Sequence, residues 1–226
     1  MRFFSARENR GFPINLQAKH SQVFKRSFDL LASFLGIVVL VVPFFVVALL
    51  VKISSPGPLF YCQKRVGRFG NLFTCVKFRT MYCGSDTLGS VTSAGDSRIT
   101  PIGKFLRKFK LDEFPQLFNV LIGKMSFVGP RPDVPGYADK LSGDNRDILL
   151  LRPGITGPAS IFFRNEEKLL AEQPDPKTYN DLVLWPAKVA LNLAYLRNWS
   201  FWRDIGYILV TLFPWINRVL RLVEEK

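Results

Sequence analysis

One uncharged apolar segment, from Leu30 to Val51, constrains this chain more than any other feature. Only Ser33, Gly36 and Pro43 interrupt it. A stretch of about 20 apolar residues suffices to span a bilayer as a helix, so the segment is long enough to enter a membrane. It is too long for a signal peptide, and no small-residue cleavage site follows it. The sequence therefore predicts membrane association through this segment.

Positive charges flank the apolar segment on both sides. Cationic residues next to membrane segments prefer the cytoplasmic face. Both ends of this segment carry such residues, so both ends are expected on that face. Pro43 lies near the centre, where it removes a backbone hydrogen bond and bends a helix. A re-entrant membrane helix-break-helix over residues 24–53, with Pro43 at the turn, satisfies both observations, and a proline-kinked transmembrane helix is the alternative. The flanking cations are Arg2, Arg7, Arg10, Lys19, Lys25 and Arg26 before the segment and Lys52, Lys64, Arg65 and Arg68 after it.

Charge and composition narrow the chemistry. A net charge of +13 over 226 residues indicates a polyanionic partner, such as nucleic acid, anionic lipid or a phosphorylated substrate. His20 is the only histidine, which argues against Ser-His-Asp hydrolysis and histidine-rich metal catalysis. Cys62, Cys75 and Cys83 have no C-x-x-C spacing, which favours a reducing compartment over a disulfide framework or a zinc site. The chemistry must therefore use carboxylates, lysine, arginine or a bound cation.

The sequence after the apolar segment predicts a hairpin and then helices. Residues 59–66 and 72–81 are expected to form two short strands around a glycine-containing turn, and 84–97 a loop. Thr100-Pro101 is typical of a helix start, with threonine as cap and proline in the first turn. The apolar face expected for that helix consists of Ile102, Phe105, Leu106 and Phe109. Asp112 is expected to cap a second helix that ends near Gly123.

The C-terminal half is expected to pass from loops to helices. The segments around Arg131-Pro132 and Arg152-Pro153-Gly154 are expected to be largely loop. Residues 180–198 and 205–222 are expected to be helical, with a break at Pro214. Arginines alternate with all four tryptophans, a pattern that suits a membrane surface at headgroup level, although core packing explains each single tryptophan equally well. The tryptophans are Trp185, Trp199, Trp202 and Trp215, and the arginines are Arg197, Arg203, Arg218 and Arg221.

Two adjacent carboxylates, Asp112 and Glu113, follow a basic run. Acids in so cationic a setting are expected to be ionised and able to work beside phosphates. Taken alone, the pair is better explained as a helix cap followed by a solvated acid. Lys77 and Arg79 also have a plain explanation, because they alternate with apolar residues as on the exposed face of a strand. The basic run consists of Lys104, Arg107, Lys108 and Lys110.

A series of motifs in fixed order resembles the bacterial sugar transferase family, the small monotopic phosphoglycosyl transferases. The resemblance extends from about Phe24 to Leu212. The motifs are Lys25-Arg26-Ser27-Phe28-Asp29, Ser55-Pro56-Gly57-Pro58-Leu59-Phe60, Gln63-Lys64-Arg65-Val66-Gly67, Lys77-Phe78-Arg79-Thr80-Met81, Asp96-Ser97-Arg98-Ile99-Thr100, Leu111-Asp112-Glu113-Phe114-Pro115-Gln116-Leu117, Ser126-Phe127-Val128-Gly129-Pro130-Arg131-Pro132 and Arg152-Pro153-Gly154-Ile155-Thr156-Gly157. The chain departs from the family at Val42, where serine is common, and at Pro158 to Arg164, where many relatives read Leu-Ala-Gln-Val-Asn-Gly-Arg. Sugar preference therefore cannot be transferred from those relatives.

The resemblance implies a reaction and its setting. A sugar-1-phosphate would move from a UDP-sugar to undecaprenyl (polyprenyl) phosphate with release of UMP, the first membrane step of glycoconjugate synthesis. Asp112 would attack the phosphate to give a covalent phospho-sugar enzyme, which the lipid phosphate then attacks with help from Mg²⁺. The setting would be the cytoplasmic face of a bacterial inner membrane, reached by a re-entrant helix. The oligomeric state stays open, a homo-oligomer included.

Cations must neutralise a phosphoanhydride before a carboxylate can approach it. The candidate phosphate-binding residues are Lys77, Arg79, Arg107, Arg131 and, as a nucleotide contact, Arg152. Asp112 is expected to stay anionic at a helix N-terminus and to ligate the metal, whereas Glu113 is expected to relay a proton or help hold Mg²⁺. Asp204 matches an acidic position of the family or pairs with a neighbouring arginine, and Asp96 and Arg98 are expected to order the loop before Thr100.

The fold class expected is α/β mixed and helix-dominated, as a single compact domain. Residues 1–23 would form a tail, 24–53 the re-entrant membrane hairpin, and 54–226 the catalytic domain with C-terminal interfacial amphipathic helices. The alternatives are a membrane-tethered nucleic-acid-binding or regulatory module and a non-catalytic scaffold. No recognisable nucleic-acid module is present, so a nucleic-acid partner is not expected.

Overall fold

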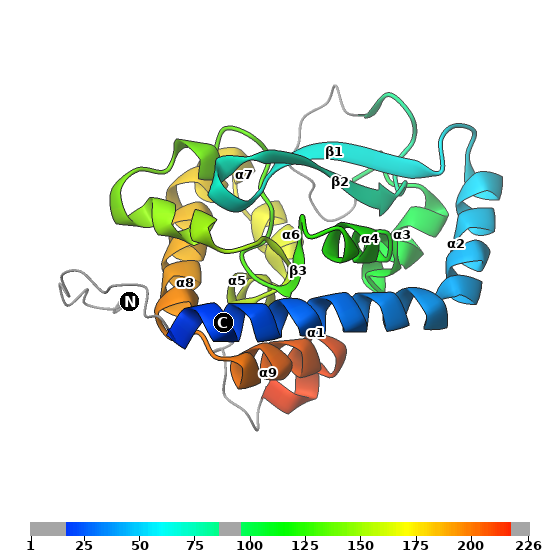
Figure 1. The fold of residues 1–226 in the computed structure, drawn as a ribbon. Helices are drawn as coiled ribbons and strands as arrows, with labels where there is room; N and C mark the ends of the chain where they lie inside the picture. The colour runs from blue at the N-terminus through cyan, green and yellow to red at the C-terminus, as the bar shows by residue number, and fades with distance from the viewer. Residues whose placement is uncertain (1–16, 86–95, 218–226) are drawn as a thin grey trace.

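The apolar segment folds into two helices joined at a sharp bend. In the computed structural model, which describes residues 17–85 and 96–217, α1 (Gln17–Val39) and α2 (Val41–Ser54) meet at Leu40 with a bend of 63° (Figure 1). Pro43 cannot donate a hydrogen bond to the carbonyl of Val39, so the break falls one turn before the proline. Among the described residues no single helix is long and apolar enough to cross a membrane, whereas the bent pair meets that test when taken together.

One face of α1 packs on the domain, and the opposite face is exposed. Asp29 and Ser33 are buried four residues apart, and the Asp29 carboxylate accepts a hydrogen bond from the Phe127 backbone N–H at 3.1 Å. The helix runs across the lower part of the domain in Figure 1, above α9, and its first residues fall within the segment expected to be a tail. The exposed apolar side chains of α1 include Leu31, Phe34, Leu35, Val38 and Val39. They continue onto α2 as Val42, Phe45, Val46, Leu49 and Ile53.

The predicted hairpin is confirmed. The strands β1 (Phe60–Val66) and β2 (Leu72–Phe78) pair antiparallel, with Phe60 opposite Phe78 and Val66 opposite Leu72. A short turn, η1 (Arg68–Gly70), joins them. The loop expected at 84–97 falls mostly on residues 86–95, outside the described part of the chain. At its far end Arg98 forms an ion pair with Asp96 at 2.6 Å, as expected for an ordered approach to the next helix.

The helix start at Thr100 is confirmed, but the expected cap at Asp112 is wrong. Thr100 caps α3 (Pro101–Lys108) by accepting a hydrogen bond from the Gly103 N–H at 2.9 Å. Lys110 then adopts the left-handed conformation, with φ of 58°, and turns the chain into a short 3₁₀ helix, η3 (Leu111–Glu113). Asp112 therefore lies inside this turn, and α4 (Gln116–Leu121) begins without a side-chain cap.

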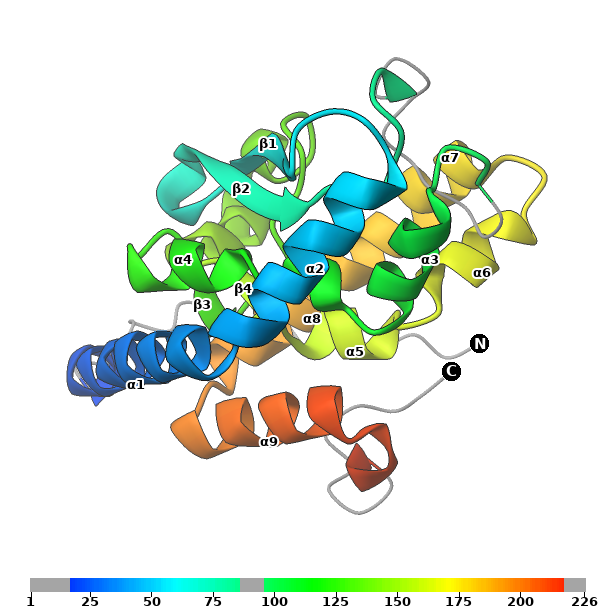
Figure 2. The same ribbon diagram turned by 90° about the vertical axis from the view of Figure 1, so that its right-hand side faces the viewer.

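The apolar face expected for α3 is only partly buried. Leu106 is fully buried against α2 residues Val47 and Val51. Phe105 and Phe109, in contrast, are 49% and 54% exposed. Figure 2 shows α2 crossing the domain beside α3. The exposed phenylalanines leave a second apolar surface near the bent helix pair.

The segments around Arg131-Pro132 and Arg152-Pro153 are largely loop, as expected, but a parallel strand pair that the sequence did not predict borders them. β3 (Ser126–Val128) pairs with β4 (Gly154–Thr156), which brings two of the sequence motifs together. The approach is so close that a Cβ at Gly129 would lie 2.3 Å from the Arg152 carbonyl oxygen, so glycine is required there. Strands of three residues among glycines and prolines carry no periodic signal, which explains why the sequence did not predict them.

The C-terminal part that the structure describes, after β4, is largely helical, as expected. Residues 180–198 form η6 (Asn180–Leu184), a π-helical turn, and α8 (Trp185–Arg197), while α9 (Phe201–Leu212) ends before the predicted break at Pro214. Residues from 218 onward, with Arg218 and Arg221, lie outside the described part. Trp202 and Trp215 are 79% and 67% exposed, whereas Trp185 and Trp199 are half-buried. The remaining elements are η4 (Ala138–Lys140), η5 (Gly143–Leu150), α5 (Pro158–Phe162), α6 (Glu166–Ala171), α7 (Pro176–Tyr179) and η7 (Pro214–Ile216).

Candidate functional site

Three of the predicted site residues meet at one carboxylate oxygen. Oε1 of Glu113 accepts hydrogen bonds from Lys77 Nζ at 2.9 Å and from Arg131 Nη2 at 2.8 Å. The glutamate is buried, with 7% of its surface exposed. These residues come from η3, from β2 and from the loop after β3, so the tertiary fold assembles the cluster.

Local structure explains how each cation reaches Glu113. The hairpin register fixes Lys77 opposite Tyr61 near the end of β2. The loop that carries Arg131 is pinned on both sides of that residue, because the Gly154 N–H donates to the Pro130 carbonyl at 2.8 Å and Arg65 Nη1 donates to the Pro132 carbonyl at 3.0 Å. Arg131 is therefore presented from a rigid backbone between its two prolines.

The two acids of the pair have opposite electrostatics. Burial works against ionisation of Glu113, but the charges of Arg131 and Lys77 outweigh it and hold the pKa of this carboxyl well below its usual range. Burial and the charge of Glu113 raise the pKa of Asp112 above its ordinary value. Contrary to expectation, the cationic neighbours do not bring the pKa of Asp112 below its ordinary value, and no regular helix begins there to supply a dipole. Lys77 and Arg131 donate to Glu113 instead.

Asp112 has an oxygen without a partner. Its Oδ1 is fully buried and accepts no hydrogen bond from any residue that the structure describes. A buried polar atom left unpaired costs about 1–3 kcal/mol, so proteins rarely keep one without a reason. The atom lies beside a cationic cluster and belongs to the motif Leu111 to Leu117. The oxygen can therefore still accept a hydrogen bond.

The other predicted phosphate-binding residues lie at the edge of this cluster or away from it. Arg107 forms an ion pair with Glu167 at 2.5 Å and is close enough to counteract the rise in the pKa of Asp112. Arg79 is buried and donates to the backbone carbonyls of Ser55 at 2.7 Å and Pro56 at 2.6 Å. It thereby fastens the turn that follows α2.

Arg152 lies in a different basic group. Its Nε donates to the Gly123 carbonyl at 3.1 Å, and its charge acts on Arg26 and Arg68. The structure therefore brings together Asp112, Glu113, Lys77 and Arg131, with Arg107 beside them. It does not bring Arg79 or Arg152 into this cluster.

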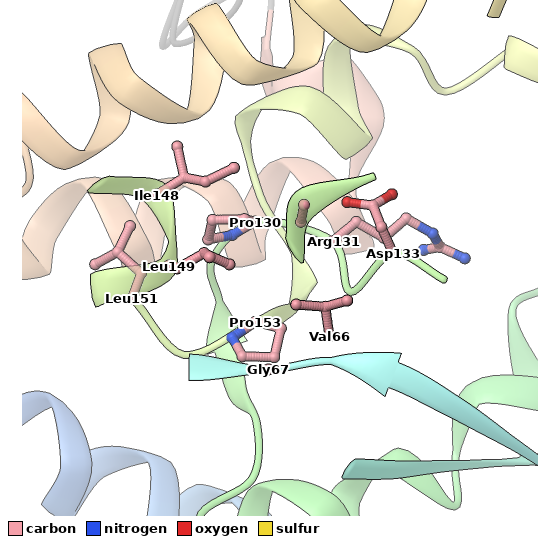
Figure 3. Close-up of a pocket in the computed structure, with 10 residues that line it drawn as sticks. Val66, Gly67, Pro130, Arg131, Asp133, Ile148, Leu149, Leu151 and Pro153 are labelled. Atoms are coloured by element: carbon pink, nitrogen blue, oxygen red, sulfur yellow. The ribbon is translucent and has the colours of Figure 1, made fainter. Parts of the chain in front are cut away.

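Several residues around the site were not singled out from the sequence. One pocket beside Glu113 is lined by Arg65, Lys77, Gln116 and Arg131. A second pocket, shown in Figure 3, is lined by Arg131 and Asp133 together with apolar side chains. Only their position in the sequence could have pointed to these residues. Arg65 lies in one family motif, and Asp133 directly follows another.

A magnesium site is compatible with the donor atoms present. Among the described residues, no group of three or more His, Cys, Asp or Glu side chains is placed to hold a metal. Mg²⁺ commonly takes only one or two carboxylates together with substrate phosphates and water. The unpaired Oδ1 of Asp112 next to the ionised Glu113 fits that kind of site.

Asp204, a buried acid on α9, lies outside this cluster and contacts residues of α1 and α8. It forms an ion pair with Lys25, which corrects the expectation of an arginine partner. Tyr195 Oη donates to its Oδ1 at 2.6 Å and Trp199 Nε1 to its Oδ2 at 3.0 Å. Both oxygens are therefore engaged, and the network connects α1 to the C-terminal helices.

Comparison with known proteins gives a consistent result. The family model described as "Bacterial sugar transferase" matches residues 20–218. The chain is 40% identical over 196 residues to an "Undecaprenyl-phosphate glucose phosphotransferase" from Komagataeibacter xylinus, which covers 83% of this chain and 35% of that protein. It is 35% identical over 215 residues to a "UDP-galactose-lipid carrier transferase" from Erwinia amylovora, covering 88% of this chain and 42% of that protein.

A relative of similar length also matches. The "Exopolysaccharide production protein ExoY" from Sinorhizobium fredii is 34% identical over 206 residues, which cover 84% of each chain. The chain thus spans well under half of the two longer relatives but most of this shorter one.

Proposed function

Because the chain belongs to the bacterial sugar transferase family, we propose that it transfers a sugar-1-phosphate from a UDP-sugar to undecaprenyl phosphate and releases UMP. The observation that supports this reaction most directly is the unpaired, buried Oδ1 of Asp112 beside the cluster of Lys77, Glu113 and Arg131. The printed names of the relatives, which refer to undecaprenyl phosphate and to sugar carriers, agree with it.

Asp112 is the proposed nucleophile. Its carboxylate oxygen attacks the sugar-bearing phosphorus, the phosphoanhydride bond breaks, and UMP leaves with that electron pair. An oxygen of the lipid phosphate then attacks the same phosphorus and releases the Asp112 carboxylate. A carboxylate with a raised pKa is the more basic nucleophile, and its ionised fraction grows as the pH rises through that pKa. Activity is therefore expected to rise with pH through the pKa of Asp112.

Arg131 and Lys77 are proposed to bind the diphosphate of the UDP-sugar. Arg131 and Lys77 share Glu113 and keep further N–H donors, with which they can contact phosphate oxygens. Glu113 remains ionised and holds both cations in position. A Mg²⁺ ion beside Asp112 and Glu113, when bound, would neutralise phosphate charge and favour the leaving group.

The bent helix pair is the proposed membrane element. Its exposed apolar side chains form a surface too large to be left in water without a partner. We place them in the cytoplasmic leaflet of a bacterial inner membrane, with α1 and α2 forming a re-entrant hairpin. Trp202 on α9 and Trp215 after it, both exposed, would lie at the headgroup level. The alternative of a nucleic-acid-binding or regulatory module is not favoured by the relatives.

UMP release tests the proposal. The purified full chain in detergent is given Mg²⁺, undecaprenyl phosphate and a panel of UDP-sugars, with Asp112→Asn as the inactive variant. Asp144→Asn, an exposed substitution on η5, is the matched control. Release of UMP from at least one donor, retained in the control and lost with Asp112→Asn, supports the reaction. Full activity of Asp112→Asn contradicts the nucleophile, and no release from any donor contradicts the function.

A further inference from the structure

Lys110 adopts a backbone conformation that lysine rarely takes. Its φ of 58° lies in the left-handed region, where glycine fits without strain and a longer side chain does not. Hydrogen bonds hold the residue on both sides, because its N–H donates to the Arg107 carbonyl at 3.3 Å and its carbonyl accepts from the Glu113 N–H at 3.2 Å. Strained residues that persist in a fold cluster at functional sites. The turn itself therefore gives no reason for a lysine at this position.

The charge of Lys110 acts on both acids of the candidate site. Burial and the charge of Glu113 raise the pKa of Asp112, and Lys110 is among the cations that counteract this rise. It is also one of the three cations whose charges outweigh burial and lower the pKa of Glu113. Interactions between charges weaken with distance, so the Lys110 ammonium group lies near both carboxylates.

Lys110 differs from the other two of these cations in having no partner. Lys77 and Arg131 each donate a hydrogen bond to Glu113. Within the part of the chain that the structure describes, the ammonium group of Lys110 makes no hydrogen bond and no ion pair, and the residue is exposed. A lysine ammonium carries three N–H donors. Those of Lys110 are therefore available to an anion that enters the site.

Lys110 connects the helix beside the proposed membrane element to the reaction centre. It follows directly on Phe109, the residue that ends α3 and is 54% exposed. The helix α3 packs on α2 through the buried Leu106, and Figure 2 shows the two helices side by side. On its other side Lys110 leads into η3, the turn that contains Asp112. An anion that arrives from the membrane along α3 would therefore meet Lys110 next to Asp112.

The second step of the proposed reaction needs a cation of its own. Lys77 and Arg131 are already assigned to the diphosphate of the donor. The lipid phosphate is an anion that must approach the anionic phospho-sugar bonded to Asp112, and a positive charge beside it reduces their repulsion. Lysine supplies a point charge on a flexible stem, which suits a phosphate group that enters in each turnover.

We propose that Lys110 binds the phosphate group of the acceptor lipid and holds it against the phosphorus bonded to Asp112. The proposal rests on the proposed function. The ammonium group donates hydrogen bonds to phosphate oxygens that do not attack, so no covalent bond to Lys110 forms or breaks. Lys110 thus serves the acceptor, whereas Lys77 and Arg131 serve the donor.

Separate kinetics for the two substrates test this assignment. When a covalent intermediate divides the reaction into two steps, kcat/KM for each substrate reports only on the step that this substrate enters. UMP release by the full chain in detergent with Mg²⁺ is measured against varied undecaprenyl phosphate and, separately, against varied UDP-sugar. Lys110→Gln should lose at least about tenfold in kcat/KM for undecaprenyl phosphate, the equivalent of about 1.4 kcal/mol, and stay within about twofold for the UDP-sugar.

Two further variants separate charge from shape. Lys110→Arg keeps the positive charge and should restore most of the lost kcat/KM for undecaprenyl phosphate. Lys104→Gln removes another exposed charge from the same basic run and is the matched control, so it should keep both values of kcat/KM. Because the Lys110 ammonium group has no partner in the fold, Lys110→Gln should melt within about 2 °C of wild type.

The outcomes that would overturn the proposal are distinct. An equal loss of kcat/KM for both substrates would assign Lys110 to the donor or to the fold. An unchanged kcat/KM for undecaprenyl phosphate in Lys110→Gln would show that the acceptor does not use this residue, while the proposed function would stand. If wild type releases no UMP from any donor, the proposed function fails and the assignment of Lys110 fails with it.

Discussion

Two buried aspartates, Asp204 and Asp112, show how similar surroundings serve different purposes. They are 3% and 7% exposed, and both lie near lysine or arginine. Every oxygen of Asp204 has a partner, since it accepts from Tyr195 and Trp199 and pairs with Lys25. Asp112 keeps its Oδ1 unpaired, while the cations beside it bind Glu113.

The difference shows that burial of an acid does not reveal its task, whereas the pairing of its oxygens does. Asp204 fastens the amphipathic helix α1 to the core, because Lys25 also donates to the Val128 carbonyl at 2.9 Å. Asp112 makes no comparable stabilising contacts, and the burial of its carboxyl group costs desolvation free energy. The first acid stabilises the fold, and the second is maintained at the expense of stability.

Substitution of Asp112 by Asn should give the largest effect on activity. The variant loses the nucleophile, so UMP release should fall at least about 1,000-fold. Its melting temperature should stay equal to wild type or rise, because the amide avoids burial of a charge. UMP release and thermal unfolding of the same detergent-solubilised preparation measure both. A marked loss of stability would show that Asp112, like Asp204, is a structural acid.

Substitution of Asp204 by Asn should give the opposite result. Removal of one partner of a buried ion pair leaves Lys25 without its counter-ion and costs about 3–5 kcal/mol in unfolding free energy. Activity per folded molecule should remain within about threefold of wild type, since no described contact joins Asp204 to Asp112. Denaturant titration and UMP release separate the two quantities. Loss of activity without loss of stability would mean that Asp204 belongs to the reaction.

The sequence predicted the local secondary structure, but it did not predict the side-chain pairing between residues distant in the chain. The hairpin at residues 60–78, the cap at Thr100 and the break before Pro214 follow from residue types within a few positions of each other. The motif around Asp112 was recognised, and Lys77 and Arg131 were assigned to the same site. The sequence did not reveal that Glu113 takes both cations, because that depends on three elements distant in the chain.

The wrong expectations share a physical cause. Asp112 was read as a cap because Pro115 and the following apolar residues suggest a helix start, but the left-handed turn at Lys110 places it inside a 3₁₀ helix. The strands β3 and β4 were missed because strands of only three residues, bordered by glycine and proline, show no alternation. Asp133 has no sequence signal apart from its position after Pro132, because its surroundings depend on cations that pair with Glu113 and Glu166 instead.

Substitution of Glu113 by Gln tests the coupling within the pair. Lys77 and Arg131 lose their shared acceptor, and because both retain some exposure the stability cost should be about 1–2 kcal/mol. The negative charge that raises the pKa of Asp112 also disappears, so the acidic limb of the rate against pH should move to lower pH. The maximal rate should fall about 10- to 100-fold as the cations lose their orientation. A pH–rate profile of UMP release measures this, and an unmoved acidic limb would contradict the coupling.

Among these substitutions, Asp133→Asn should have the smallest effect, and it should stabilise the fold. The folded-state pKa of about 6 exceeds the ordinary 3.8, so wild type loses stability as pH rises from about 4 to 6 and carries the full penalty above that. The amide has no such penalty, and partial exposure limits the gain to about 1–2 kcal/mol at pH 7.5. The two proteins should become equally stable near pH 4. Unfolding measured at both pH values tests this, with Asp144→Asn as control. A variant less stable than wild type at pH 7.5 would place Asp133 with Asp204 among the acids that hold the fold together.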